Sequence, residues 1–200
     1  MPKAFSKQEK ETIRSQLHAE GQRLFATHGL KKTSVEDLTK AVGISKGAFY
    51  LFYPSKEELM MAILEQIETE IQTRILNYAT GTQVNARQQV QEILIHFLLL
   101  WDDYPLLKHF SQEDYLYLVR KLPAERVQAH IDQDEVFIMN FTAKLAQDGI
   151  VMNAPPHMVA NLIKSLFFIG LHRDDLGDDA YRETMAILID LVAGYMTEGV

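Results

Sequence analysis

The segment TSVEDLTKAVGISKGAFYLFYPSKEEL, residues 33–59, has the pattern of two short helices joined by a tight turn. Thr33 and Ser34 are residue types that cap helix N-termini, and each is followed three positions later by an acidic residue. Gly43 suits a left-handed helix end, and Ser45 is placed to cap a second helix. Because helices this short are marginal in isolation, we expect them to pack through a small apolar core made of Leu38, Val42, Ile44 and Phe49.

Two short helices that cross at a tight turn form a helix-turn-helix, whose second helix enters the DNA major groove with its N-terminal end first. Lys46 at that end suits guanine O6 and N7 or a phosphate, and Ala48 suits a thymine methyl group. Gly47 would let the backbone approach a base, and Tyr50 would offer its ring and hydroxyl to sugar and phosphate. Lys56 begins the next helix, where free N–H groups also favour a phosphate. The residues expected to bind DNA are Thr33, Ser34, Ser45, Lys46, Gly47, Ala48, Tyr50 and Lys56.

Two other classes of function fit parts of the same segment. Residues 43–47 satisfy the G-x-S-x-G motif of serine esterases, but that motif requires a strand before the serine, and the residues before Ser45 have helical spacing. The second alternative is a helical sensor or scaffold protein without DNA binding, in which Lys46 and Lys56 are solvated lysines. An ester-hydrolysis assay tests the first alternative. A steep fall of DNA affinity with salt would exclude the second.

The charge of the chain is divided unevenly along its length. The 200 residues carry a formal net charge of −7. The first 56 residues hold 10 Lys and Arg against 5 Asp and Glu, whereas residues 57–200 hold 10 against 22. A basic N-terminal part on an acidic body indicates a local surface for double-stranded DNA, which the net charge conceals.

The composition excludes several kinds of site. The absence of cysteine rules out disulfides, zinc–thiolate sites and thiol nucleophiles. The seven histidines are scattered, with no two spaced to hold a metal on one helix, so we expect no metal site and no cofactor. The start, MPKAFSKQEK, lacks the apolar core of a signal peptide, and the longest apolar run, residues 93–101, is far too short to span a membrane. These features predict a cytoplasmic protein with no membrane partner.

The remainder of the chain also has helical periodicity, with proline and glycine dividing the pattern and no alternation typical of strands. The prediction is an all-α chain, with a helix-turn-helix domain at residues 1–54 and a helical effector-binding and dimerisation domain at residues 55–200. The expected helices cover residues 13–28, 34–42, 45–53, 56–80, 83–103, a stretch from 105 divided at Pro123, its continuation to 149, and roughly 156–172 and 178–197.

Residues 13–63 resemble the N-terminal domain of the TetR family of bacterial transcriptional regulators. This resemblance implies a homodimer that binds a near-palindromic operator, often as a repressor, and an inducer pocket in the C-terminal body. It rests on the ordered run Leu24-Phe25, Gly29, Thr33-Ser34-Val35, Asp37-Leu38, Val42-Gly43-Ile44-Ser45-Lys46-Gly47, Phe49-Tyr50 and Ser55-Lys56-Glu57-Glu58-Leu59.

Four positions depart from the family's usual pattern. Gly21 lies mid-helix where Ala is usual, and Ala48 replaces the commoner Thr. Phe52 lacks the hydrogen-bond donor of a Tyr or His at its position. Tyr53 replaces a mostly buried Phe, so its hydroxyl group needs a partner. These departures affect individual contacts and leave the motif intact.

The final two helices carry more apolar surface than one core needs, and such helices are buried on several sides. The alternative is a wholly intramolecular core. The last helix has two apolar stripes. One contains Ile187, Leu191 and Tyr195, and the other is the stripe that we expect at the interface. We expect the dimer interface to contain Phe167, Leu171, Met185, Leu188, Ile189, Val192 and Met196.

The middle of the chain is rich in aromatic residues, which form either core or a pocket for a small effector. We expect an apolar or aromatic effector of unknown identity, whose binding changes the separation of the two DNA-binding heads through the helix at 56–80. The residues expected to line the pocket are His96, Trp101, Tyr104, Tyr115 and Asn140.

Overall fold

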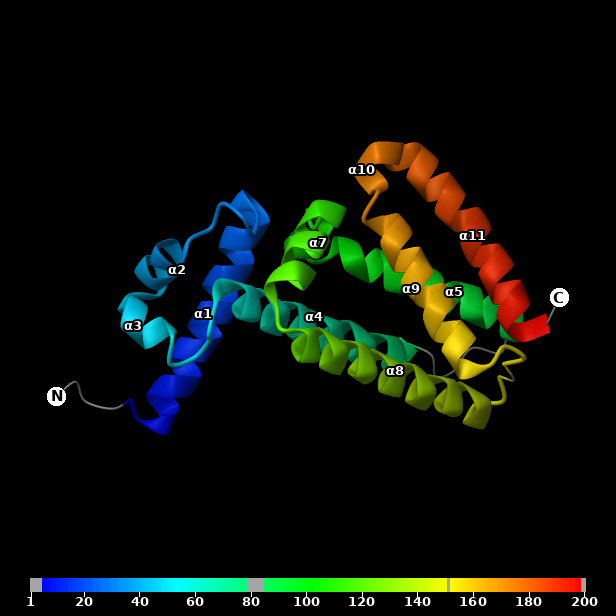
Figure 1. Cartoon of the computed structure of the whole chain (residues 1–200). Helices are drawn as coiled ribbons and strands as arrows, with labels where there is room; N and C mark the ends of the chain where they lie inside the picture. Colours follow the sequence, from blue (N-terminus) through cyan, green and yellow to red (C-terminus); the bar gives the residue numbers. More distant parts are fainter. Residues whose placement is uncertain (1–4, 79–84, 151, 199–200) are drawn as a thin grey trace. The chain divides into compact units, whose positions relative to one another are not determined.

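The computed structural model describes residues 5–78, 85–150 and 152–198, and every regular element in these ranges is a helix (Figure 1). This confirms the all-α prediction. Two compact units are present, one formed by residues 1–67 and 104–123, the other by residues 68–103 and 124–200. No helix in the described ranges is long and apolar enough to cross a membrane.

The helices divide between the units as follows. The first unit contains α1 (Lys7–His28), α2 (Val35–Val42), α3 (Lys46–Phe49), the start of α4 (Lys56–Tyr78), α6 (Pro105–Lys108) and α7 (Gln112–Lys121). The second contains the rest of α4, then α5 (Ala86–Asp102), α8 (Ala124–Gln147), α9 (Pro156–Gly170), α10 (Arg173–Leu176) and α11 (Asp178–Glu198).

Helix α1 begins earlier than the apolar pattern indicates, because it has its own cap. The Ser6 hydroxyl accepts from the backbone N–H of Glu9 at 3.2 Å, and the Glu9 carboxylate accepts from the Ser6 N–H at 2.7 Å. This capping box satisfies two backbone donors in a polar stretch without apolar periodicity. The helix ends at Gly29, as predicted, where the backbone has a positive φ of 78°.

Close packing of α1 on α4 explains the unusual Gly21. A Cβ atom on Gly21 would lie 2.8 Å from Ile63 Cδ1 and 3.2 Å from Leu59 Cδ2. Both α4 side chains are almost fully buried. The glycine therefore lets the two helices approach more closely than an alanine would without rearrangement.

The first unit extends beyond the predicted 1–54 boundary in two ways. It takes in α4 as far as Ile67, and it recruits α6 and α7 from the middle of the chain. Two polar contacts within the unit accompany the apolar burial of these helices. Tyr117 donates to the buried Glu57 carboxylate at 3.1 Å, and Lys31 forms an ion pair with Glu113. The apolar residues buried on α6, α7 and the turn between them are Leu106, Leu107, Phe110 and Leu118.

In the second unit, α5 packs along α11. Arg87 of α5 donates from Nη2 to both carboxylate oxygens of Asp190, at 2.8 and 2.9 Å, and from Nη1 to Glu198 at 3.1 Å. Gly194 allows this approach, because a Cβ there would lie 3.3 Å from the Arg87 guanidinium carbon. Asn153 ties the loop before α9 to α11 by donating its N–H to the Met196 carbonyl at 2.8 Å.

Candidate nucleic-acid interface

Helix α2 is defined at both ends by short-range backbone chemistry. Ser34 caps its N-terminus and forms a reciprocal capping box with Asp37. At the C-terminus Gly43 has φ of 76° in the left-handed region, and the N–H groups of Gly43 and Ile44 both donate to the Thr39 carbonyl. This is the tight turn that the sequence predicts, and it redirects the chain into the next helix.

Helix α3 is only four residues long, and it depends on packing for its position. The Ser45 hydroxyl caps it by accepting from the Ala48 N–H at 3.1 Å. Phe49 is completely buried and anchors the helix in the unit's core. One turn of helix does not persist in water alone, so burial of the Phe49 ring is what holds α3 in its helical form on the unit.

The opposite face of α3 is open to solvent. Lys46 and Gly47 are exposed, and Tyr50, which directly follows the helix, is 49% exposed. Leu51 is 72% exposed, an unusual value for a leucine, and it is not among the residues predicted from the sequence to bind DNA. Nothing in the apolar periodicity distinguishes Leu51 from a core residue, because its exposure follows from the turn after α3.

Lys46 is held by an acidic residue of the neighbouring helix. Its ammonium group forms an ion pair and hydrogen bond with Glu36 of α2. The bond from Lys46 lowers the pKa of the Glu36 carboxyl, and the same contact raises the pKa of Lys46. Both groups are exposed, so the pair is screened by water and salt and opens readily to a competing phosphate or base.

Two of the residues expected to bind DNA have side chains turned inward. Thr33 is 1% exposed, and its hydroxyl donates to the Gly29 carbonyl at 2.9 Å. Ala48 is buried beside Phe49, so its methyl group faces the core. Thr33 closes the loop before α2 and Ala48 packs α3 onto the unit, and their expected contacts with DNA stay a prediction.

Lys56 also makes structural contacts, and its expected role as a phosphate ligand stays a prediction. Its ammonium group donates to the carbonyls of Leu30 at 2.7 Å, Lys31 at 3.1 Å and Thr33 at 2.7 Å. An ammonium group has three donors, and here all three serve the loop between α1 and α2. Burial is the main influence on the Lys56 pKa and lowers it. The sequence motif located the residue correctly but did not reveal its backbone partners.

The hydroxyl group of Tyr53 has the partner that its burial demands. His18 of α1 lies between Tyr53 and Gln66 of α4, with its Nε2 2.7 Å from the Tyr53 hydroxyl and its Nδ1 2.6 Å from Gln66 Oε1. The amide oxygen only accepts, so Nδ1 carries a hydrogen. Burial raises the pKa of Tyr53. This chain ties α1, α4 and the turn after α3 together.

Ser45 has none of the setting of an esterase nucleophile. A nucleophile elbow needs a strand leading into the serine, whereas α2 and the Gly43 turn precede Ser45. Its hydroxyl is occupied as a helix cap. The geometry contradicts the G-x-S-x-G interpretation.

The residues expected to line an effector pocket are not brought together in one unit. His96 of α5, stacked on Tyr78 with ring centroids 4.2 Å apart, and the exposed Asn140 of α8 belong to the second unit. Tyr104 and Tyr115 belong to the first. The side chain of Trp101 lies outside the described residues. The pocket stays a prediction.

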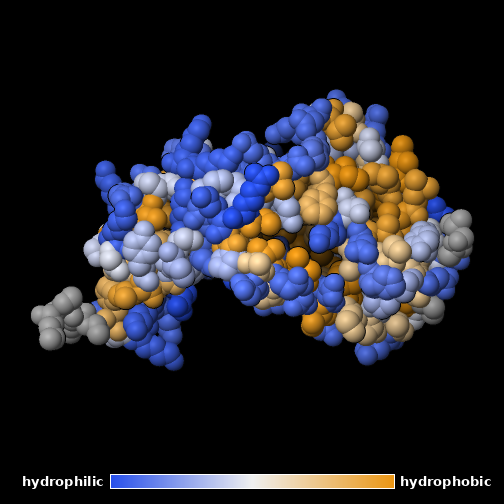
Figure 2. Space-filling model, viewed as in Figure 1, coloured by the Kyte–Doolittle hydropathy of each residue, from blue (hydrophilic) through white to orange (hydrophobic). Residues whose placement is uncertain are grey.

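The expected dimer stripe of α11 faces the interior of its own unit. Met185, Ile189 and Met196 are almost fully buried, as is Leu171 after α9, because α11 packs on α5 and α9. The exposed apolar residues are in the neighbouring stripe, with Ile187 63% and Leu191 61% exposed. Figure 2 shows apolar side chains gathered along α11. Three expected interface residues are half-buried beside the exposed stripe: Phe167, Leu188 and Val192.

Comparisons with known proteins agree with this local geometry. Residues 19–63 match the model of the N-terminal domain of "Bacterial regulatory proteins, tetR family". The Bacillus subtilis protein described as the uncharacterized HTH-type transcriptional regulator YuxN is 33% identical over 132 residues, covering 62% of this chain and 44% of that protein. The HTH-type transcriptional regulator AcrR of Shigella flexneri is 32% identical over 46% of this chain and 43% of its own length. The chain therefore aligns with less than half of each of these two relatives.

Similarity over a larger part of the chain is also found. The nucleoid occlusion factor SlmA of Glaesserella parasuis is 27% identical over 75% of this chain and 80% of its own length. A putative TetR-family regulator from Syntrophomonas wolfei has a structure with a TM-score of 0.67, covering 96% of this chain and 97% of that one at 17% identity. A TetR-family regulator from Pectobacterium atrosepticum gives a TM-score of 0.61 at 21% identity, with 94% of each chain covered. At these identities the structures establish a shared fold.

The position of Lys56 leads to a test of its role. We expect Lys56→Met to lower the free energy of unfolding by about 1 kcal/mol or more, because carbonyls that lose a charged donor remain partly shielded from water. Hydrogen exchange of the peptide covering residues 30–42 should accelerate. Chemical denaturation followed by circular dichroism, with exchange mass spectrometry, measures both.

The matched control is Lys46→Met, which removes a lysine that forms an ion pair with an exposed carboxylate. It should leave unfolding unchanged within about 0.5 kcal/mol. Equal stabilities of the two variants would show that the contacts of Lys56 are not structural.

Proposed function

We propose that this chain, whose residues 19–63 match the N-terminal domain of the TetR family of bacterial regulatory proteins, is a transcriptional regulator that binds operator DNA as a homodimer through α3. A small molecule held by the second unit controls that binding, and the regulator acts as a repressor. The observation that carries the proposal is the exposed face of α3, in which Lys46 and Gly47 face outward while Phe49 is buried. The family match spans this segment, residues 19–63.

The chemistry of the α3 face suits a DNA groove. Lys46 is a donor for guanine or phosphate, and Gly47 allows the backbone to come close. Tyr50 and Leu51 extend the exposed face beyond the helix with a hydroxyl, a ring and an apolar group, which suit sugar, phosphate and a thymine methyl group. The contact set we propose is therefore Ser34, Ser45, Lys46, Gly47, Tyr50 and Leu51.

The ion pair between Lys46 and Glu36 has a role in this proposal. In free protein it keeps the lysine on the α2–α3 face, and DNA replaces the carboxylate with a phosphate or a base. An exposed pair of this kind is weak, so breaking it on DNA binding costs little free energy. Glu36 also repels phosphate, and it therefore penalises binding in which Lys46 is not correctly placed.

Homodimerisation is proposed through the exposed stripe of α11. Ile187 and Leu191 are one helical turn apart and share a face. Exposed apolar stripes of this kind are typical of protein interfaces. A two-fold dimer would present two α3 helices to a near-palindromic site.

Selection of bound sequences from a random duplex pool tests the function as a whole. The purified full chain should enrich a near-palindrome, because two-fold symmetry places the same helix on each half-site. The affinity for the selected site should fall steeply with salt, with a slope of about −0.9 per phosphate contacted. Failure to enrich any duplex sequence would favour the sensor or scaffold interpretation.

Removing the Lys46 side chain should reduce both affinity and base preference. Lys46→Ala is expected to weaken binding to the selected site by about 1–3 kcal/mol. The control is Lys164→Ala, which removes an exposed lysine from α9 in the other unit. Fluorescence anisotropy with the selected site and with single-base variants measures the two effects. An unchanged base preference in Lys46→Ala would remove this residue from the specific contacts.

Charge in the exposed stripe of α11 should break the dimer. We expect Ile187→Glu combined with Leu191→Glu to convert a particle of twice 22.9 kDa into a monomer, because each apolar side chain buried in an interface contributes about 1.5–3 kcal/mol. The matched control is Val136→Glu with Met139→Glu, two similarly exposed apolar residues of α8. Light scattering after size-exclusion chromatography gives the masses. A dimer that survives the α11 substitutions would require another interface.

A further inference from the structure

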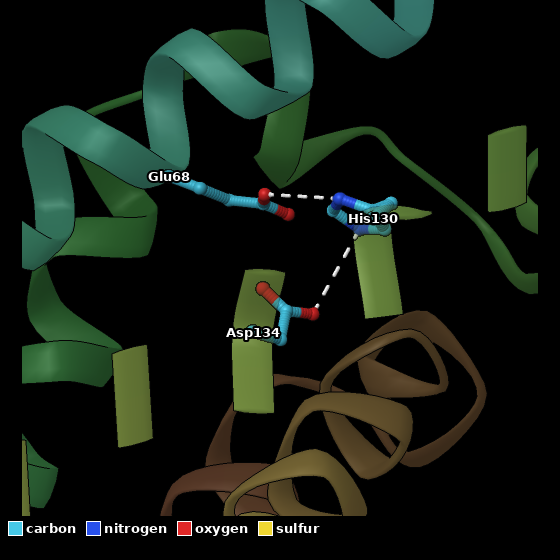
Figure 3. A group of neighbouring side chains, drawn as sticks. All are labelled: Glu68, His130 and Asp134. Carbon is cyan, nitrogen blue, oxygen red and sulfur yellow. Dashed lines mark ion pairs between the residues drawn. The ribbon is translucent and has the colours of Figure 1, made fainter. Parts of the chain in front are cut away.

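A cluster of metal-ligand residues lies in the second unit, whereas the helix-turn-helix belongs to the first. It consists of Glu68 on α4 together with His130 and Asp134 on α8. Figure 3 shows Glu68 pointing from its helix toward the His130 ring, with Asp134 below the ring and facing its other nitrogen. One ligand atom of each residue lies within 4.8 Å of the other two.

The backbone positions these three side chains. His130 and Asp134 are four residues apart on α8, so they project from the same helical face. Glu68 comes from a different helix, 62 residues earlier in the sequence. No spacing rule on a single helix detects such a set, which is why the sequence predicted no metal site.

The distances within the cluster are compatible with a shared ion. His130 Nδ1 lies 3.7 Å from Glu68 Oε2, and Nε2 lies 3.9 Å from Asp134 Oδ2. Both separations exceed the roughly 2.7–3.2 Å of an N–H···O hydrogen bond. Ligand bonds of about 2.0–2.2 Å to a tetrahedral zinc ion place the ligand atoms about 3.4 Å apart. The two carboxylates face different ring nitrogens, and one ion binds only one of these nitrogens, so a rotamer change of Glu68 or Asp134 must bring both carboxylates to the same nitrogen.

The charge and burial of the cluster also suit a divalent cation. Two carboxylates and a neutral imidazole carry two negative charges, which one divalent ion neutralises. The His130 side chain is only 19% exposed, whereas those of Glu68 and Asp134 are 37% and 51% exposed. Attraction between charges is stronger where water is partly excluded, and the exposed side gives an ion access from solvent.

We propose that Glu68, His130 and Asp134 form a site for a divalent transition-metal ion, with one imidazole nitrogen and two carboxylate oxygens as protein ligands. This donor set is one that Zn²⁺ accepts, and three protein ligands leave a coordination position for water or a small ligand. The ion would link α4 to α8 at Glu68, the first α4 residue of the second unit.

Zinc titration of the full, tag-free chain after treatment with a chelator tests the site. Isothermal titration calorimetry should give about one high-affinity Zn²⁺ per chain. Loss of an outer-shell partner typically weakens metal binding about 10–100-fold, so loss of a ligand in His130→Ala or Glu68→Gln should weaken it at least tenfold. Co²⁺ in the same site should give visible absorption bands in the wild-type chain that both variants lose.

The matched control is His172→Ala, because His172 forms a 2.9 Å pair with Asp175 in the same unit without belonging to a three-ligand cluster. This variant should bind Zn²⁺ as the wild-type chain does. Circular dichroism checks the helix content, and Asp134→Asn replaces any variant that does not fold. Unchanged zinc affinity in the ligand variants, or no saturable binding by the wild-type chain, would overturn the proposal.

Discussion

Burial of Phe49 is the interaction on which the proposed DNA-binding surface depends. A four-residue helix has too few backbone hydrogen bonds to persist in water. The ring of Phe49 fixes α3 on the first unit, and the Ser45 cap and left-handed Gly43 set its direction. The same anchoring turns Lys46 outward, because the buried and exposed residues of one helical turn lie on opposite faces.

The loop between α1 and α2 is held by charge where the chain offers no regular hydrogen bonding. Lys56 supplies three N–H donors to carbonyls that would otherwise depend on water. Thr33 closes the same loop from within. Two residues of the recognisable motif therefore stabilise the platform on which α3 rests, and the exposed residues beside them carry the surface proposed for DNA.

The second unit keeps its core and its external surfaces on different stripes of the same helix. Met185 and Ile189 of α11 are buried, whereas Ile187 and Leu191 are exposed. Both stripes are equally apolar in sequence, so hydrophobicity marks α11 as buried on several sides but does not say which side is intramolecular. The cluster of Glu68, His130 and Asp134 likewise exists only because two helices meet.

The sequence by itself determined the helical class, the helix-turn-helix pattern between Thr33 and Leu59, and the resemblance of residues 13–63 to a family of regulators. Each follows from local rules: capping residues, a turn glycine and apolar spacing act over a few residues. Tertiary structure alone decided that Lys56 and Thr33 serve the backbone, that α6 and α7 join the first unit, and which stripe of α11 is exposed. Those outcomes depend on contacts between distant segments, whose partners no local pattern specifies.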